Sequence, residues 1–288
     1  MAQPTTDTVL KDSRFTESLD CGSPRWPRIA LAATLAVGML PGVCQSHEGN
    51  QDQAVQTTND FAYETVIYVD TEQTPVESHT TIFVGETAYD WETQRALLID
   101  FAARRIVLLN AQKQIQTSLD FPAMEWRLGQ TKISLRQAAK SADPRERAMW
   151  NFLLEPSYQI QGDSESRVVG FTDRSVKYTV SVQKPTDGDV RQKLARFLDM
   201  TTRMSAIQNP WGFARMPVNK WLHEHDMIPT RIVRELTQGL GGKTSTVRSQ
   251  HEVREQVSNK DRTKIDEIHF WLRDFRSVDF DTYQKSTR

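Results

Sequence analysis

The feature that most constrains the fold is a series of short alternating segments that begins at Phe61 and ends near Leu119. In the first segment, apolar and polar side chains alternate with a period of two residues, which is typical of a half-buried strand. Segments of the same kind follow at 80–85, 87–91, 95–101, 104–110 and 113–119. The breaks between them are too short for a crossover helix, so consecutive strands must run antiparallel. The sequence therefore predicts a β-meander.

After the meander, the sequence contains both helical and strand patterns. Helices are expected at 122–141, 144–154, 190–204, 218–225 and 259–276, and further strands at 157–161, 166–172, 175–183, 230–237 and 246–257. The clearest helix follows a cap at Thr186 or Asp187 and has one apolar stripe, and the last helix follows a capping-box pattern at Ser258–Asp261. The sequence predicts an α+β fold, in which a curved antiparallel meander sheet, with an unclosed barrel as one form of it, is covered by helices.

The N-terminal part of the chain contains one strongly apolar stretch, Ile29–Leu40, which follows Arg25 and Arg28. A short apolar core between positive charge and small residues is typical of a secretory signal peptide, and a membrane-spanning helix needs about 20 residues. An uncleaved signal anchor is the alternative.

These patterns divide the chain into four parts. They are a leader with a signal peptide or signal anchor at 1–46, a polar tether at 47–60, one α+β domain at 61–280 with a candidate sub-boundary at 185–188, and a tail at 281–288.

Cysteine usage agrees with export. Cys21 and Cys44 are the two cysteines and both precede the body, so the body has no disulfide framework. Cys44 is also a minority candidate for lipidation. Both interpretations of the signal place the body outside the cytoplasm, periplasmic or membrane-tethered, with membrane contact only through 29–43 if the signal is uncleaved.

Charge and motifs argue against nucleic acid and nucleotide partners. The chain has 36 basic and 37 acidic side chains, which removes the electrostatic basis for binding nucleic acid. Gly242-Lys243-Thr244 resembles the end of a phosphate-binding loop, but that motif needs glycine where Thr237 stands and a helix afterwards. An alternating segment follows instead, which indicates a hairpin. No cofactor is expected.

The densest group of metal-ligand residue types is His223, His225 and Asp226. A helical zinc motif needs a second histidine where Met227 stands, and histidines at a helix end are explained by the helix dipole. These residues are therefore weak metal candidates, and the expectation is that no metal is bound. The remaining histidines are isolated in the sequence, and His251 is expected to be a hydrogen-bonded core residue.

Two carboxylates and three aromatic residues are further candidates. Asp90, beside Trp91, and Asp100 are potential general acids, although a turn or backbone role explains both. Trp91, Trp211 and Phe213 are weak candidates for contact with an apolar ligand.

In element order, residues 60–184 resemble the unclosed-barrel fold of bacterial lipoprotein carriers and related envelope lipid-binding proteins. The resemblance implies a curved sheet with a lipid-binding concave side and transfers no functional residue. The stretches AYDWETQRALLIDFAARRIVLLN and NPWGFARMPVNKWL are also similar to uncharacterised exported bacterial proteins.

The function expected from the sequence is that of a non-catalytic exported cell-envelope protein that binds a lipid, a peptide or a protein partner. One alternative is an extracytoplasmic hydrolase in which His223, His225 or Asp90 converges with other polar groups. The other alternative is a membrane-tethered scaffold.

Overall fold

The computed structural model describes residues 60–163, 165–185, 187–237 and 244–287. The predicted leader, the tether up to residue 59 and the glycine-rich hairpin tip at 238–243 lie outside these residues, as does residue 186 in the candidate sub-boundary. The described residues belong to one compact unit. No helix in this part of the chain is long and apolar enough to cross a membrane.

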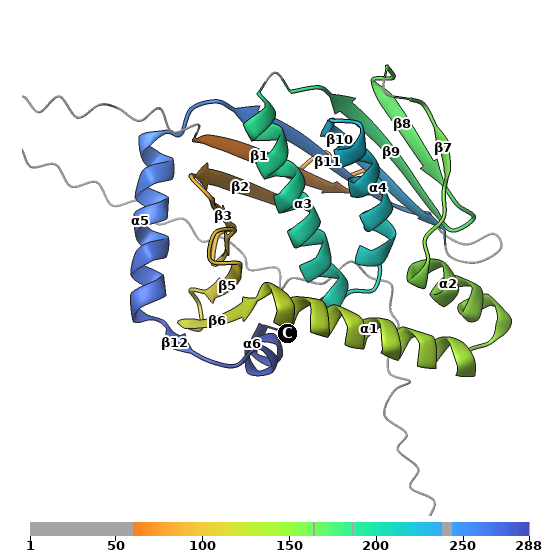
Figure 1. Cartoon of the computed structure of the whole chain (residues 1–288), viewed down its shortest axis with the longest axis horizontal. Helices are drawn as coiled ribbons and strands as arrows, with labels where there is room; N and C mark the ends of the chain where they lie inside the picture. Colours follow the sequence, from red (N-terminus) through yellow and green to blue (C-terminus); the bar gives the residue numbers. More distant parts are fainter. Residues whose placement is uncertain (1–59, 164, 186, 238–243, 288) are drawn as a thin grey trace, which may run out of the picture. The chain divides into compact units, whose positions relative to one another are not determined.

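One sheet organises the described part of the chain (Figure 1). Its twelve strands are β1 (Phe61–Val69), β2 (Glu77–Val84), β3 (Thr87–Trp91), β4 (Arg95–Asp100), β5 (Arg105–Asn110), β6 (Ile115–Asp120), β7 (Gln159–Gln161), β8 (Val168–Thr172), β9 (Val176–Gln183), β10 (Ile228–Thr237), β11 (Thr244–Arg254) and β12 (Arg276–Ser277). The strand order is β12-β6-β5-β4-β3-β2-β1-β11-β10-β9-β8-β7.

The predicted meander is the run from β1 to β6, in which each strand pairs antiparallel with the next. The hairpin of β10 and β11 comes late in the sequence but lies in the middle of the sheet. β11 pairs with β1, and β10 pairs with β9. This hairpin therefore joins the meander to the shorter set of strands β7–β9.

Six helices accompany the sheet within the described residues. They are α1 (Phe121–Ser141), α2 (Pro144–Leu154), α3 (Gly188–Gln208), α4 (Gly212–Glu224), α5 (Asn259–Asp274) and α6 (Phe280–Thr287). The side chains of Asp120 and Asp187 cap α1 and α3, and Ser258 with Asp261 forms the predicted capping box of α5.

Helices pack on both faces of the sheet. We call the face that α3 and α4 cover the inner face (Figure 1). In the meander the inner face carries Phe83, Ile99 and Ile106, which form one core with Leu194 and Phe197 of α3. The alternate side chains of β3–β5 point to the outer face and pack against α5 through Ile268 and Trp271, among others. This two-sided packing explains why β4 and β5 carry apolar side chains on both of their faces.

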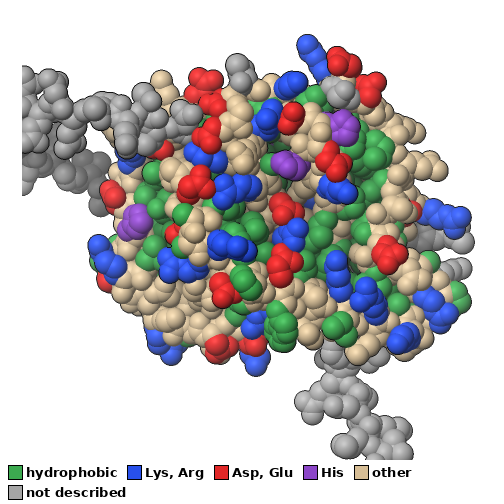
Figure 2. Space-filling model, in the orientation of Figure 1, with side chains coloured by type: hydrophobic (Ala, Val, Ile, Leu, Met, Phe, Trp, Pro, Cys, Tyr) green, Lys and Arg blue, Asp and Glu red, His purple; other side chains and the backbone are tan. Residues whose placement is uncertain are grey.

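The structure confirms the α+β prediction: the sheet is mostly antiparallel, unclosed and covered by helices. Acidic and basic side chains are interspersed over the face of the molecule that Figure 2 shows.

The C-terminal segment differs from the prediction of a tail. Residues 281–287 belong to α6, because the side chains of Phe280 and Tyr283 are buried against the body. The short strand β12 before it pairs parallel with β6, which makes one end of the sheet mixed.

The fourth helix also begins earlier than predicted. Residue 218 is the predicted start of this helix, but α4 starts at Gly212 and contains Pro217. Gly212 is buried and lies against the backbone of Ala206 in α3, so packing between the two helices starts α4 where the sequence indicates a break.

Candidate functional site

Polar side chains occupy part of the inner face beside the apolar core. In β2 the residues Glu77, His79 and Thr81 alternate with outward-facing residues, so all three point to the inner face together with Phe83. Across the strand pair, Thr81 is opposite Asp90 of β3. Glu92 follows β3 directly. One histidine and three carboxylates from two neighbouring strands therefore lie close together on the inner face.

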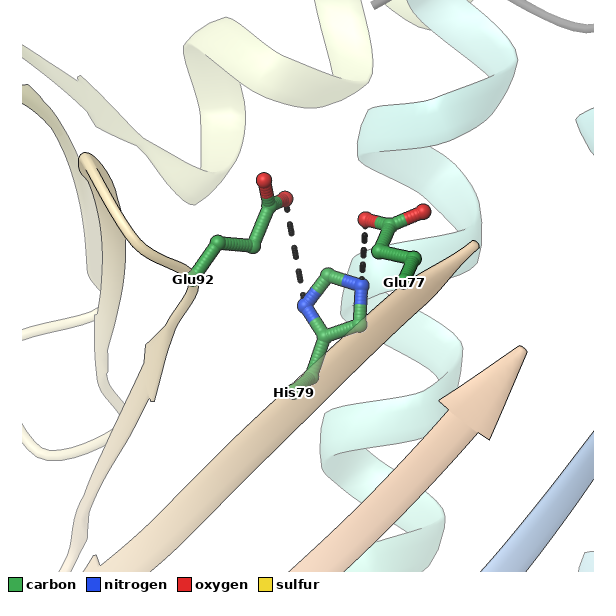
Figure 3. A group of neighbouring side chains, drawn as sticks. All are labelled: Glu77, His79 and Glu92. Carbon is green, nitrogen blue, oxygen red and sulfur yellow. Dashed lines mark ion pairs between the residues drawn. The ribbon is translucent and has the colours of Figure 1, made fainter. Parts of the chain in front are cut away.

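Figure 3 shows the imidazole of His79 between the carboxylates of Glu77 and Glu92. The Nε2 atom of His79 lies 2.5 Å from Oε1 of Glu77. Its Nδ1 atom lies 3.8 Å from Oε1 of Glu92 and 3.9 Å from Oδ2 of Asp90. The hydroxyl of Thr81 donates a hydrogen bond of 2.7 Å to Oδ1 of Asp90, which fixes that carboxylate beside the ring. We call Glu77, His79, Asp90 and Glu92 the histidine–carboxylate cluster.

The cluster is partly shielded from solvent, and this shapes its proton equilibria. Burial lowers the pKa of His79, but the hydrogen bond to Glu77 and the negative charges of Asp90, Glu77 and Glu92 outweigh it and raise that pKa to about 9. Burial and the charge of Glu77 raise the pKa of Glu92 to about 7. Burial also raises the pKa of Asp90.

Glu77 behaves in the opposite way. Burial alone would raise the pKa of Glu77, but the hydrogen bond and positive charge of His79 prevail and lower it. The cluster therefore contains a close ion pair between Glu77 and His79, with two further carboxylates that have no equally close cation in the cluster. Its negative charge exceeds its positive charge when all three acids are ionised.

This arrangement has the composition of a cation site. One ligand atom each from Glu77, His79 and Glu92 lies within 4.8 Å of the others. Nitrogen and carboxylate oxygen donors suit zinc, manganese, iron, cobalt or nickel ions rather than calcium or magnesium, which prefer oxygen alone. Three protein ligands also leave coordination positions for water or a ligand.

The sequence-based metal candidates lie elsewhere and do not converge. His225 follows the end of α4, where its Nδ1 atom is 2.9 Å from the carbonyl oxygen of Trp221 and its ring stacks on that indole with centroids 4.0 Å apart. Asp226 pairs with Arg191 at 3.3 Å. His223 is exposed on α4. Among the described residues, none of these three belongs to a group of three potential ligands close enough to share an ion.

The aromatic candidates also separate. Trp91 packs with the outer-face core under α5, and Phe213 is buried with Leu128 and Leu135 of α1. Trp211 lines a cavity between the C-terminal half of α3, the start of α4 and the strands β9–β11.

Two of the plainer predictions are confirmed. His251 makes contacts of 3.0 Å with Oγ1 of Thr65 and 2.8 Å with Oγ of Ser249, as expected of a hydrogen-bonded core residue. Asp100 ends β4 and accepts a hydrogen bond of 2.8 Å from the backbone N–H of Ala103, which is a turn role.

Sequence patterns alone do not reveal the histidine–carboxylate cluster, because His79 is isolated from the other histidines in the sequence and Asp90 stands where a strand is expected to turn. A signal was present: Glu77 and His79 are two residues apart in a strand and must share a face. The contribution of Asp90 and Glu92 depends on the β2–β3 register, which the sequence does not specify.

No protein-family model matches this chain, and no curated protein matches it either.

Proposed function

We propose that this chain is an exported cell-envelope protein that binds a partner rather than catalysing a reaction, and that a divalent cation completes its binding site. The observation that carries the proposal is the convergence of Glu77, His79 and Glu92, whose ligand atoms lie within 4.8 Å of one another. The partner is a lipid, a peptide or an envelope protein that supplies a donor atom to the cation. Export rests on the apolar stretch Ile29–Leu40 and its flanking residues.

Electrostatics favours a cation at this position. Three carboxylates surround one imidazole, and burial raises the pKa of both Asp90 and Glu92 because their charges are poorly solvated. A divalent ion between Glu77, His79 and Glu92 removes this repulsion and replaces the lost hydration. Asp90, held by Thr81, then acts as an outer carboxylate that orients the imidazole.

The three proposed ligands lie on or directly after two paired strands, which hold their backbone rigidly. Glu77 and His79 belong to β2, and Glu92 follows β3, which pairs with β2 over five residues. Ligands on hydrogen-bonded strands are held more rigidly than ligands on long loops. The cluster is partly open to solvent, because its four side chains are between 18% and 28% exposed.

A second candidate function is an extracytoplasmic hydrolase, favoured by the position of Asp90 beside the cluster. A cation at this cluster would lower the pKa of a bound water, and Asp90 would accept its proton. The binding function is preferred because it requires only the cation site, whereas catalysis also requires groups that orient a substrate.

Metal binding by the full chain tests the proposal. The protein is treated with a chelator, desalted and titrated with zinc, manganese and cobalt chlorides at pH 8 in a calorimeter. We expect one ion per chain, with at least tenfold weaker binding in His79→Gln and in Glu92→Gln, because each variant removes one ligand. Binding should tighten as pH rises from 6 to 9, because His79 and Glu92 must lose protons to coordinate the ion.

The matched control is Glu252→Gln, which changes an exposed carboxylate on β11 and should leave the affinity unchanged. Failure of every ion to bind, or equal binding by His79→Gln and Glu252→Gln, would show that the cluster is only a structural ion-pair network. Turnover of simple ester or phosphoester substrates that requires both the ion and Asp90 would favour the hydrolase instead.

A further inference from the structure

A second polar site lies on the inner face, away from the histidine–carboxylate cluster. It is a cavity of about 260 Å³ between the C-terminal half of α3, the start of α4 and strands β9–β11. Two arginines line it, Arg215 from α4 and Arg234 from β10. Tyr178, Thr202 and Ser249 add hydroxyl groups to its wall. We call this cavity the arginine pocket.

Neither arginine is neutralised by a carboxylate of the described residues. Nε of Arg215 donates a hydrogen bond of 2.8 Å to Oδ1 of Asn219, and its guanidinium lies over the ring of Tyr178 at 5.8 Å from the centroid. In β10, Arg234 is opposite Tyr178 on one side and Val247 on the other, so its cross-strand neighbours are uncharged. Within the described residues, no carboxylate forms an ion pair with either guanidinium, whereas arginines elsewhere on the sheet and helices do pair.

Two buried polar atoms at or near the arginines have no hydrogen-bond partner in the described structure. Nε of Arg234 is buried and has no hydrogen-bond partner in the described structure. The hydroxyl of Tyr63 is likewise buried without a partner, and that side chain is only 1% exposed. Native proteins rarely leave such groups unpaired unless a ligand or water satisfies them.

The described titratable groups that act on Arg215 and on His251 add no negative charge. Burial lowers the pKa of Arg215, the charge of Arg234 lowers it further, and the nearby Tyr178, Tyr63 and Tyr158 oppose this effect. His251, stacked on Tyr63 with centroids 5.3 Å apart, has its pKa lowered to about 3 by burial and by Arg215, and so is neutral at physiological pH. The pocket therefore carries two positive charges without a counterion from the described chain.

We infer that the arginine pocket binds a phosphate group, either as free phosphate or as the phosphomonoester of a larger molecule. Two guanidinium groups match the charge of a phosphate dianion, and arginine donates paired hydrogen bonds to its oxygens. The hydroxyl groups of the wall supply further donors. The volume suits a head group better than an acyl chain, since pockets for drug-sized molecules start near 300 Å³. The pocket shares no residue with the cation cluster, so the two sites are tested independently.

The test is calorimetric titration of the full chain with inorganic phosphate and with glycerol phosphate, at low salt. We expect wild-type protein to bind both and Arg234→Gln and Arg215→Gln to bind at least tenfold more weakly. Arg231→Gln is the matched control, because Arg231 lies on the same strand but points to the opposite face and is exposed. It should change the affinity less than twofold.

Thermal unfolding keeps the test valid if a variant folds poorly. Without phosphate, Arg234→Gln should melt at or above the wild-type temperature, because it removes an unpaired partly buried charge. With phosphate, the wild-type melting temperature should rise and that of Arg234→Gln should not.

A vesicle-binding experiment distinguishes a lipid head group from a soluble phosphate ligand. Association with vesicles that contain phosphatidic acid, lost in Arg234→Gln, identifies a lipid head group, whereas phosphate binding without vesicle association identifies a soluble ligand. The inference is overturned if wild-type protein binds neither phosphate probe at about 10 mM. It is also overturned if Arg234→Gln and Arg231→Gln bind alike, or if acetate competes as strongly as phosphate.

Discussion

His79 keeps its proton to a higher pH than a solvent-exposed imidazole because Glu77 contacts one ring nitrogen and two more carboxylates face the other. Its pKa of about 9 in the folded protein lies above the unfolded value of 6.5. The stabilisation from this shift is therefore complete below pH 6.5 and is lost as the pH rises through 9. We compare the free energy of unfolding of the metal-free wild type with that of His79→Gln. We expect the wild type to be the more stable at pH 6.5, and we expect its advantage to shrink by on the order of 2 kcal/mol at pH 10.

Urea unfolding in the presence of a chelator measures this difference at both pH values. A double-mutant cycle with Glu77→Gln assigns it to the ion pair, because the coupling energy between Glu77 and His79 should be present at pH 6.5 and disappear at pH 10. A coupling energy that is the same at both pH values would contradict the assignment.

At the scale of the elements, the contact between α3 and α4 depends on the absence of a side chain at Gly212. A Cβ atom at this position would lie 2.6 Å from the backbone nitrogen of Ala206 and 2.7 Å from its Cα. These are backbone atoms of α3, so the helices must move apart to accept a methyl group. We expect Gly212→Ala to lower the free energy of unfolding by about 1–3 kcal/mol, measured by urea unfolding.

The control for this prediction is Gly129→Ala in α1, where an added Cβ meets nothing within 4 Å. Alanine is a better helix former than glycine, so this variant should gain about 0.5–1 kcal/mol. Opposite signs for the two substitutions separate the effect of helix packing from that of helix propensity. Equal effects would mean that the α3–α4 contact tolerates an added methyl group.

At the scale of the whole molecule, the β10–β11 hairpin makes the sheet continuous from β12 to β7. The meander core and the core that α4 covers therefore lie on one hydrogen-bonded sheet. Each core also contains residues from both sides of the candidate sub-boundary at 185–188. We expect one cooperative thermal transition, with equal calorimetric and van't Hoff enthalpies. Ile99→Ala and Val169→Ala, one in each core and each 0% exposed, should both lower that same transition temperature. Two transitions, each sensitive to only one variant, would show that the cores unfold as separate domains.

The sequence predicted the local pieces well because their signals are local. The period-2 alternation from Phe61 onward gave the meander, and the apolar stripe through Leu194 and Phe197 gave α3. Its errors came from packing between distant segments. Phe280 and Tyr283 turn a predicted tail into α6, and the close approach of Gly212 to Ala206 starts α4 earlier than the pattern indicates.

By itself, the sequence determined the α+β class, the antiparallel order of β1 to β6 and most element boundaries, since hydrophobic period, caps and short connections specify them. Only the tertiary structure decided which candidate residues meet. The β2–β3 register places Asp90 and Glu92 beside His79, and the insertion of β10 next to β9 brings Arg234 to Tyr178 and Arg215. The physical reason is that both sites join side chains from different elements, and their proximity depends on strand pairing and helix packing rather than on spacing along the chain.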